Sequence, residues 1–229
     1  MYLPRHFTLS DLAQVRAFVD AAGSADLVTF DGIRPVATLL PVIWDRPADG
    51  NGDGADGEGG EPGSFGRLLG HLALANDQWH TARPDAQALA IVRGPQAYIS
   101  PSWYESTARH GRTVPTWNYE LVHLTGPVAF HRDPEWLREI VTRLTRRHED
   151  WRERPWAVTD APPDFINGQL RAIVGVELTV TSVQAKQKLG QNRGRADQAA
   201  AAAALRDERG PGPAAIADLM LANLTDEPA

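Results

Sequence analysis

Residues 94–104 read GPQAYISPSWY, and residues 114–123 read VPTWNYELVH. In both stretches apolar and aromatic residues are interrupted by Gly, Pro and Ser, which is typical of short β-strands that end in tight turns. We predict strand structure at residues 98–99 and over residues 116–124. This part of the chain therefore favours an antiparallel barrel or sandwich.

More strands are predicted on both sides of this segment. Residues 35–44 form a nearly continuous apolar run, which suits a buried strand. Residues 176–180 alternate apolar with polar side chains, as a half-buried strand does. The remaining strand patterns cover residues 27–30, 64–74, 88–93 and 127–131.

Helices are predicted towards both ends of the chain. Thr8 is expected to cap a helix that runs to Ala22, with Asp11 at its third position and Gly23 as its stop. Asp133 is expected to cap a second helix. Further helices are predicted at residues 164–171, 195–207 and 213–224, so that a single domain over residues 1–229 carries a C-terminal helical extension at about 195–224.

Residues 46–63, RPADGNGDGADGEGGEPG, contain seven glycines, two prolines and five acids, a composition that predicts an acidic surface loop. The residues at 49, 51, 53 and 54 match the start of a calcium-binding EF-hand loop. Its twelfth position is Gly60, where a bidentate glutamate is needed, and Glu61 comes one residue late. An acidic insertion is therefore preferred over a calcium site.

Composition excludes several kinds of site. The chain has no cysteine, which rules out disulfides, thiolate zinc sites and iron–sulfur clusters. No apolar run is long enough to span a membrane, and the first residues lack a signal-peptide pattern, so we expect a cytoplasmic protein. The net charge of −6 disfavours nucleic-acid binding by the molecule as a whole.

The sequence shows no familiar catalytic motif, and its seven histidines are not spaced as metal ligands, so no catalytic or metal-binding residue is predicted. Six of the eleven Trp and Tyr residues fall between Trp79 and Tyr119, among short polar side chains. This pattern suits a planar heteroaromatic ligand, which is held by stacking and a few hydrogen bonds. The alternative is the aromatic core of a barrel.

Residues 178–196 contain no acid and hold both lysines of the chain, Lys186 and Lys188, together with Arg193 and Arg195. The segment is either a solvated connection or an anion site for a cofactor phosphate or a nucleic-acid backbone. DNA is a possible partner on this basis, although no DNA-reading motif is visible.

Six sequence blocks, taken in order, resemble those of the PaiB family, bacterial proteins described as FMN-binding negative transcriptional regulators. The resemblance implies a mainly β fold with peripheral helices, the FMN-binding split barrel, which is a six-stranded antiparallel Greek-key barrel. It also implies a homodimer with flavin sites at the subunit interface. The blocks are YLPRHF (2–7), GHLALANDQW (70–79), GPQAYISPSWY (94–104), VPTWNYELVH (114–123), IVGVE (173–177) and KQKLGQNR (186–193).

The resemblance implies FMN as the cofactor, with tryptophans as a stacking wall, serines as donors and an asparagine at the edge of the flavin ring. Family members usually carry an arginine and a proline where this chain has Leu74 and Asp77. Loss of a charged phosphate contact weakens binding, so we expect micromolar rather than nanomolar affinity. The predicted cofactor-binding residues are His71, Asn76, Ser100, Ser102, Trp103, Trp117, Asn118 and Lys186.

The function favoured by this resemblance is that of a PaiB-like FMN-binding negative transcriptional regulator that acts directly or indirectly. One alternative is a flavin-dependent oxidoreductase of the split-barrel class. Another is a split-barrel interaction module that has lost its cofactor, which the residues at 74 and 77 would favour.

Overall fold

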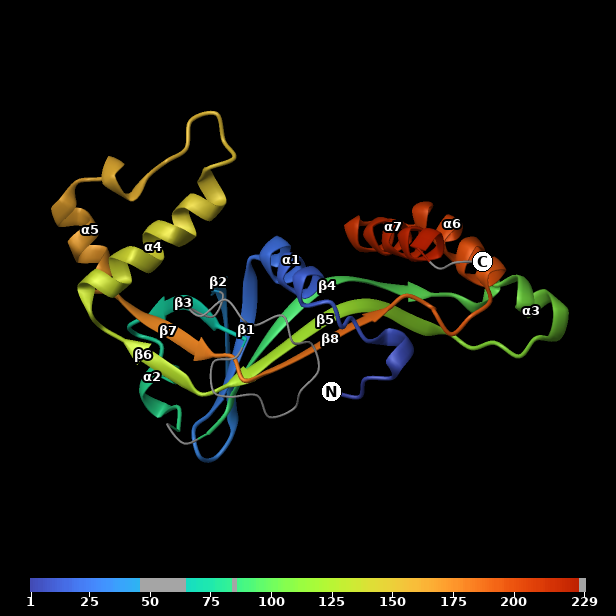
Figure 1. Ribbon diagram of the computed structural model, residues 1–229, viewed down its shortest axis with the longest axis horizontal. Helices are drawn as coiled ribbons and strands as arrows, with labels where there is room; N and C mark the ends of the chain where they lie inside the picture. The colour runs from blue at the N-terminus through green and yellow to red at the C-terminus, as the bar shows by residue number, and fades with distance from the viewer. Residues whose placement is uncertain (46–64, 84–85, 227–229) are drawn as a thin grey trace. The chain divides into compact units, whose positions relative to one another are not determined.

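The computed structural model describes residues 1–45, 65–83 and 86–226, so the predicted acidic loop at 46–63 lies outside the described residues. The described part contains eight strands, in the order β6-β7-β3-β2-β1-β4-β5-β8, instead of the six expected (Figure 1). The fold is mainly β, as predicted. The strands are β1 (Ser24–Phe30), β2 (Pro35–Asp45), β3 (Arg67–Ala73), β4 (Ala88–Ile99), β5 (Thr116–Gly126), β6 (Val128–His131), β7 (Ile173–Thr179) and β8 (Ser182–Lys188).

Ten helical segments accompany these strands in the described part of the chain. No helix within it is both long and apolar enough to cross a membrane. The α-helices are α1 (Leu12–Ala22), α2 (Gln78–Thr81), α3 (Glu105–His110), α4 (Pro134–Glu149), α5 (Pro163–Leu170), α6 (Arg195–Arg206) and α7 (Pro211–Asp226), and the short 3-10 helices are η1 (Arg5–Phe7), η2 (Pro101–Trp103) and η3 (Val158–Asp160).

Three local predictions were wrong. The first helix is capped by Asp11 rather than Thr8, because the Asp11 carboxylate accepts hydrogen bonds from the N–H groups of Ala13 (2.8 Å) and Gln14 (3.4 Å). Residues 88–93 and 98–99 are strand as predicted, but they are not separate segments, because both belong to β4, which runs on through Gly94 and Pro95. Residues 182–188 form strand β8 rather than a connection, and the N–H of Leu9 donates to the Ala185 carbonyl (3.0 Å).

The chain separates into two compact units. Unit 1 consists of Met1–Ser10, Arg93–Val122 and Gln184–Ala229, and unit 2 consists of Asp11–Val92 and His123–Val183. The boundary falls within β4, β5 and β8, each of which contributes residues to both units. The single domain predicted from sequence stays a prediction.

Unit 2 is built on the antiparallel strands β1, β2, β3, β6 and β7. Side chains alternate across each strand, and the inward set includes Leu27, Val42 and Val176, each 2% exposed. Helix α4 covers part of this sheet, because Ile140 and Leu144 pack on Leu69 of β3. The Asp133 cap predicted for this helix is confirmed, since its side chain accepts from the N–H of Trp136 (2.8 Å).

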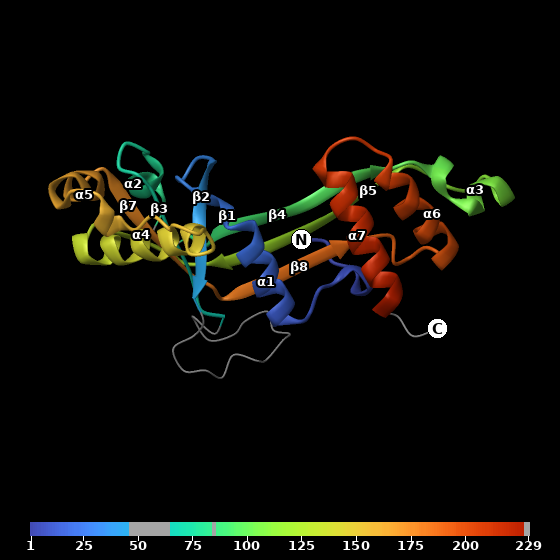
Figure 2. The ribbon, with the colours of Figure 1, turned by 90° about the horizontal axis from the view of Figure 1, so that it is seen from above.

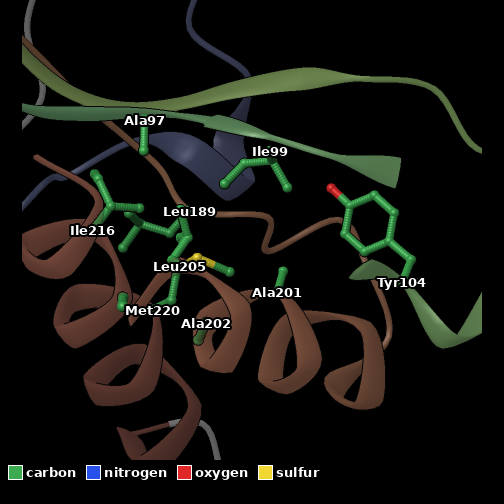
Figure 3. Packing of buried hydrophobic residues seen from close by; sticks show 10 residues of the cluster. Ala97, Ile99, Tyr104, Leu189, Ala201, Ala202, Leu205, Ile216 and Met220 are labelled. Atoms are coloured by element: carbon green, nitrogen blue, oxygen red, sulfur yellow. The ribbon is translucent and has the colours of Figure 1, made fainter. Parts of the chain in front are cut away.

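Unit 1 has a core between its part of β4 and the two C-terminal helices (Figure 3). Ala97 and Ile99 of β4 pack against residues of α6 and α7, which lie side by side in both ribbon views (Figures 1 and 2). Alternate side chains of a strand point to opposite faces, so the neighbours of Ala97 and Ile99 lie on the face away from these helices. The helices therefore cover one face of the strands in this unit and leave the other available to carry a site.

Candidate functional site

The face of unit 1 that points away from α6 and α7 carries aromatic and basic side chains together, and Tyr2 and Phe7 cover part of it. Tyr98 and Trp117 on this face are 48% and 46% exposed. Tyr119 lies two residues beyond Trp117 on β5, and the Lys186 ammonium is 5.4 Å from the centre of its ring. We call this the aromatic–basic surface, which comprises Tyr98, Trp117, Tyr119, Lys186 and Lys188.

The two exposed rings of this surface are held in defined orientations. Tyr98 and Trp117 meet edge to face, with ring centres 6.3 Å apart and planes at 63°. The indole N–H of Trp117 donates to Oε1 of Gln96 (3.0 Å), which fixes the ring to β4. An oriented indole that remains about half exposed is a suitable platform for stacking a flat ligand.

The two lysines have hydrogen-bond partners but no counter-charge among the described residues. Lys186 is 8% exposed, and its ammonium donates to the Tyr2 carbonyl (3.0 Å) and lies within 6 Å of the rings of Tyr2 and Phe7. The Lys188 ammonium donates to the Trp117 carbonyl (2.6 Å) and to the Thr116 hydroxyl. Neither contacts a carboxylate in the part of the chain that is described.

Burial and like charges act together on Lys188. The pKa of its ammonium is lowered, first because burial penalises the charged form and then because Lys186 and Arg193 repel it. An anion bound beside these cations would relieve the repulsion and raise that pKa. Exposed aromatic rings next to uncompensated cations are the groups that a flavin ring and its phosphate require, so the residues present fit FMN.

The structure places two of the predicted cofactor residues, Trp117 and Lys186, on the aromatic–basic surface. Trp103 instead packs against the cluster formed with α6 and α7. Asn118 is 1% exposed on the helix-covered face, and its amide nitrogen lies 3.4 Å from the sulfur of Met220. Neighbouring residues of a strand point to opposite faces, so Asn118 and Trp117 do not share a surface.

The two predicted serines form a local turn at the end of β4. Ser100 caps η2, and its hydroxyl accepts from the N–H of Ser102 (3.3 Å) and lies 2.7 Å from the Ser102 hydroxyl. The Ser102 side chain is exposed. These hydroxyls thus have partners within the turn, while Ser102 remains open to solvent.

The other two predicted residues, His71 and Asn76, belong to unit 2. Burial lowers the pKa of His71 by penalising its charged form. The side chain of Asn76 donates to the Thr38 hydroxyl (2.8 Å) and accepts from the N–H of Gln78 (2.9 Å), so it stabilises the start of α2. Leu74, where the family resemblance led us to expect arginine, offers its carbonyl to the indole N–H of Trp79 (3.0 Å).

The predicted set omitted Tyr98, Tyr119 and Lys188. Tyr119 and Lys188 each lie two residues from a predicted site residue on the same strand, Trp117 and Lys186 respectively. A two-residue spacing places side chains on one face, so this signal was available in the sequence once the strands were assigned.

Comparison with known proteins gives matches along most of the chain. Residues 1–182 match a family model described as "Putative FMN-binding domain". The chain is 30% identical over 220 residues to the Bacillus subtilis "Protease synthase and sporulation protein PAI 2", and the alignment covers 96% of each protein.

Among solved structures, the flavocytochrome Anf3 from Azotobacter vinelandii is similar, with a TM-score of 0.52, 14% identity, and coverage of 82% of this chain and 72% of that one. The FAD and heme binding protein from Mycobacterium smegmatis is similar with a TM-score of 0.50, 12% identity, and coverage of 80% and 74%. These two similarities show a shared fold.

Proposed function

The chain belongs to the PaiB family of FMN-binding domains, and from that membership we propose that it binds FMN on the aromatic–basic surface. One observation supports this location. The ammonium groups of Lys186 and Lys188 have no carboxylate partner among the described residues, and they lie next to the exposed and oriented indole of Trp117. When bound, FMN supplies a ring that accepts and returns one or two electrons.

Each part of this surface has a distinct role in the proposal. Trp117 stacks on the flavin, and Gln96 and Tyr98 hold its indole in place. Lys188 attracts the phosphate and donates hydrogen bonds to it, and the buried Lys186 ammonium adds its charge from behind. Lys186 is itself positioned by the Tyr2 carbonyl and neighbouring rings, so the first residues of the chain support the site.

Mixing the protein with FMN should quench flavin fluorescence with micromolar affinity, because a stacked indole is an electron donor in contact with the ring. Trp117→Ala should weaken binding about fivefold to tenfold, since an aromatic pair adds about 1 kcal/mol beyond the area it buries. Trp151→Ala is the matched control, because Trp151 is 74% exposed and belongs to unit 2. If the Trp117→Ala variant binds FMN as tightly as the parent protein, Trp117 is not part of the site.

We also propose a homodimer, which the apolar surface of unit 2 supports. Leu39 of β2 is 67% exposed, and Phe30 of β1 is 40% exposed. Val28 of β1 pairs with Ala37 and Leu89 on the neighbouring strands, so these side chains extend the same apolar face. Asp26, opposite Leu39, is a charged residue on this otherwise apolar face. An exposed face that is mostly apolar commonly marks a protein interface.

Leu39→Lys should convert the dimer to a monomer, because two copies that meet through the same face would each have to desolvate the new ammonium together with the carboxylate of Asp26, which lies opposite position 39. Sedimentation velocity at micromolar concentration measures the change. Gln14→Lys, which adds a charge on a helix of the same unit, should leave the dimer intact. A parent protein that sediments as a monomer would refute the homodimer.

The regulatory part of the proposal is that this FMN-binding protein represses transcription, directly or indirectly, and it rests on the family resemblance. Three measurements separate it from the alternatives. Oxidation of NADH or NADPH by the protein with FMN, above the rate with free FMN, would favour an oxidoreductase. A salt-sensitive shift of promoter DNA that is absent with shuffled DNA would favour direct regulation. A protein that binds no FMN would favour the interaction module.

A further inference from the structure

Unit 2 contains a surface cavity of about 330 Å³, open to solvent, between the start of α4, the end of α5 and the start of β7. Its apolar lining consists of Pro134, Leu137, Leu170 and Ile173. Leu137 and Leu170 are 2% and 5% exposed and belong to one packed cluster, so this part of the wall is held rigidly. The volume and the apolar lining are within the range of small-molecule sites.

Two arginines line the same cavity, Arg132 just before α4 and Arg171 at the end of α5. The Arg132 guanidinium lies 5.7 Å from the ring centre of Trp79, which positions it by a cation–π contact instead of an ion pair. Neither arginine forms an ion pair with a carboxylate among the residues that are described. Their N–H groups can therefore bind a planar oxyanion from the cavity.

Asn167 adds an oriented amide to this lining. Its carbonyl oxygen accepts a hydrogen bond from the Arg138 guanidinium (2.6 Å), which leaves the NH₂ group to donate. The nearby acid Asp133 caps α4, where its carboxylate accepts from the N–H of Trp136 (2.8 Å), and it is not part of the lining. The polar side chains that line the cavity thus present hydrogen-bond donors.

We propose that this cavity binds a small organic oxyanion, a carboxylate or a phosphate carried on a small apolar body. The apolar part would lie on Leu137, Leu170 and Ile173, and Arg132 and Arg171 would bind the anionic group. All of these residues belong to unit 2, whereas the aromatic–basic surface belongs to unit 1. The proposal is therefore independent of FMN binding.

The test uses 2-naphthoate, 2-naphthyl phosphate and the uncharged 2-naphthalenemethanol as probes for the full-length protein. Saturation-transfer NMR reports binding, and ¹H–¹⁵N spectra report which residues respond. We expect at least one of the two acids to bind and to shift the side-chain amide of Asn167, and the alcohol to bind at least tenfold more weakly. The acid that binds more tightly identifies the preferred oxyanion.

Arg132→Gln and Arg171→Gln should each weaken the bound acid tenfold or more, because each removes a charge-assisted hydrogen bond. Arg146→Gln is the matched control, since Arg146 is an exposed arginine in the last turn of α4 and does not line the cavity. Thermal unfolding checks that the variants remain folded.

The proposal is overturned if neither acid binds at millimolar concentration, if the alcohol binds as tightly as the acids, or if folded Arg132→Gln and Arg171→Gln variants bind the acid with unchanged affinity. The comparison of the alcohol with the acids uses the parent protein and therefore does not depend on whether the variants fold.

Discussion

Gly126→Ala should lower the free energy of unfolding by about 3 kcal/mol or more, at the upper end of the cost of overpacking. An added Cβ would overlap the carbonyl oxygen of Thr179 and come within 2.9 Å of its carbonyl carbon. Both are backbone atoms, and a side chain that could turn aside is not among the nearest contacts. The N–H groups of Thr179 and Thr181 bond to the carbonyls of Pro127 (3.0 Å) and Thr125 (2.9 Å), so the two segments cannot separate easily.

Gly168→Ala is the control for this substitution. Gly168 lies within α5, and a Cβ added there would come no closer than 3.9 Å to the Arg171 guanidinium, an ordinary contact. Alanine in a helix is more favourable than glycine by about 0.5–1 kcal/mol, so this variant should be slightly more stable than the parent. Urea unfolding measures both variants, and a Gly126→Ala protein within 1 kcal/mol of the parent would contradict the close approach at Thr179.

The sequence predicted those strands that have an apolar pattern. In the register of β2 against β1, Leu27 lies opposite Thr38. This register buries apolar side chains whose pattern is already visible in the sequence. Strand β8 was missed because one face is polar and the other carries only Val183 and Ala185 beside the polar Gln187, so the alternation is weak. Pairing with neighbouring chain segments identifies it as a strand. Cross-strand pairing is a long-range property that a local pattern does not contain.

Only part of the candidate site could be predicted from the sequence. Trp117 and Lys186 were identified from composition and resemblance, and alternation along β5 would already have separated Trp117 from its neighbour Asn118. The contact of Lys188 with the Trp117 carbonyl depends on how β5 and β8 lie together, which the sequence does not reveal. The positive charge of residues 186–195 could be predicted from the sequence, but the groups that Lys188 contacts could not.

The advantage of FMN over riboflavin should decrease as the pH rises, because Lys188 loses its proton at a lower pH than an ordinary lysine. Its pKa lies below the usual 10.5, owing to burial and to repulsion from Lys186 and Arg193. Below that pKa the ammonium attracts the FMN phosphate, and above it the neutral amine does not. Riboflavin has no phosphate, so its affinity should not follow this titration. Fluorescence titrations with both flavins across the alkaline range measure the difference.

Lys188→Gln should weaken FMN about tenfold at neutral pH and leave riboflavin unchanged. Tenfold is the lower end for a charge-assisted hydrogen bond, because the ammonium is partly exposed and solvent screens it. In this variant, the advantage of FMN over riboflavin should no longer show the pH dependence that comes from Lys188. Arg109→Gln removes one positive charge from α3 of the same unit, where Arg109 pairs with Glu105 (3.1 Å), and should have little effect. Equal losses for FMN and riboflavin in Lys188→Gln would show that Lys188 does not contact the phosphate.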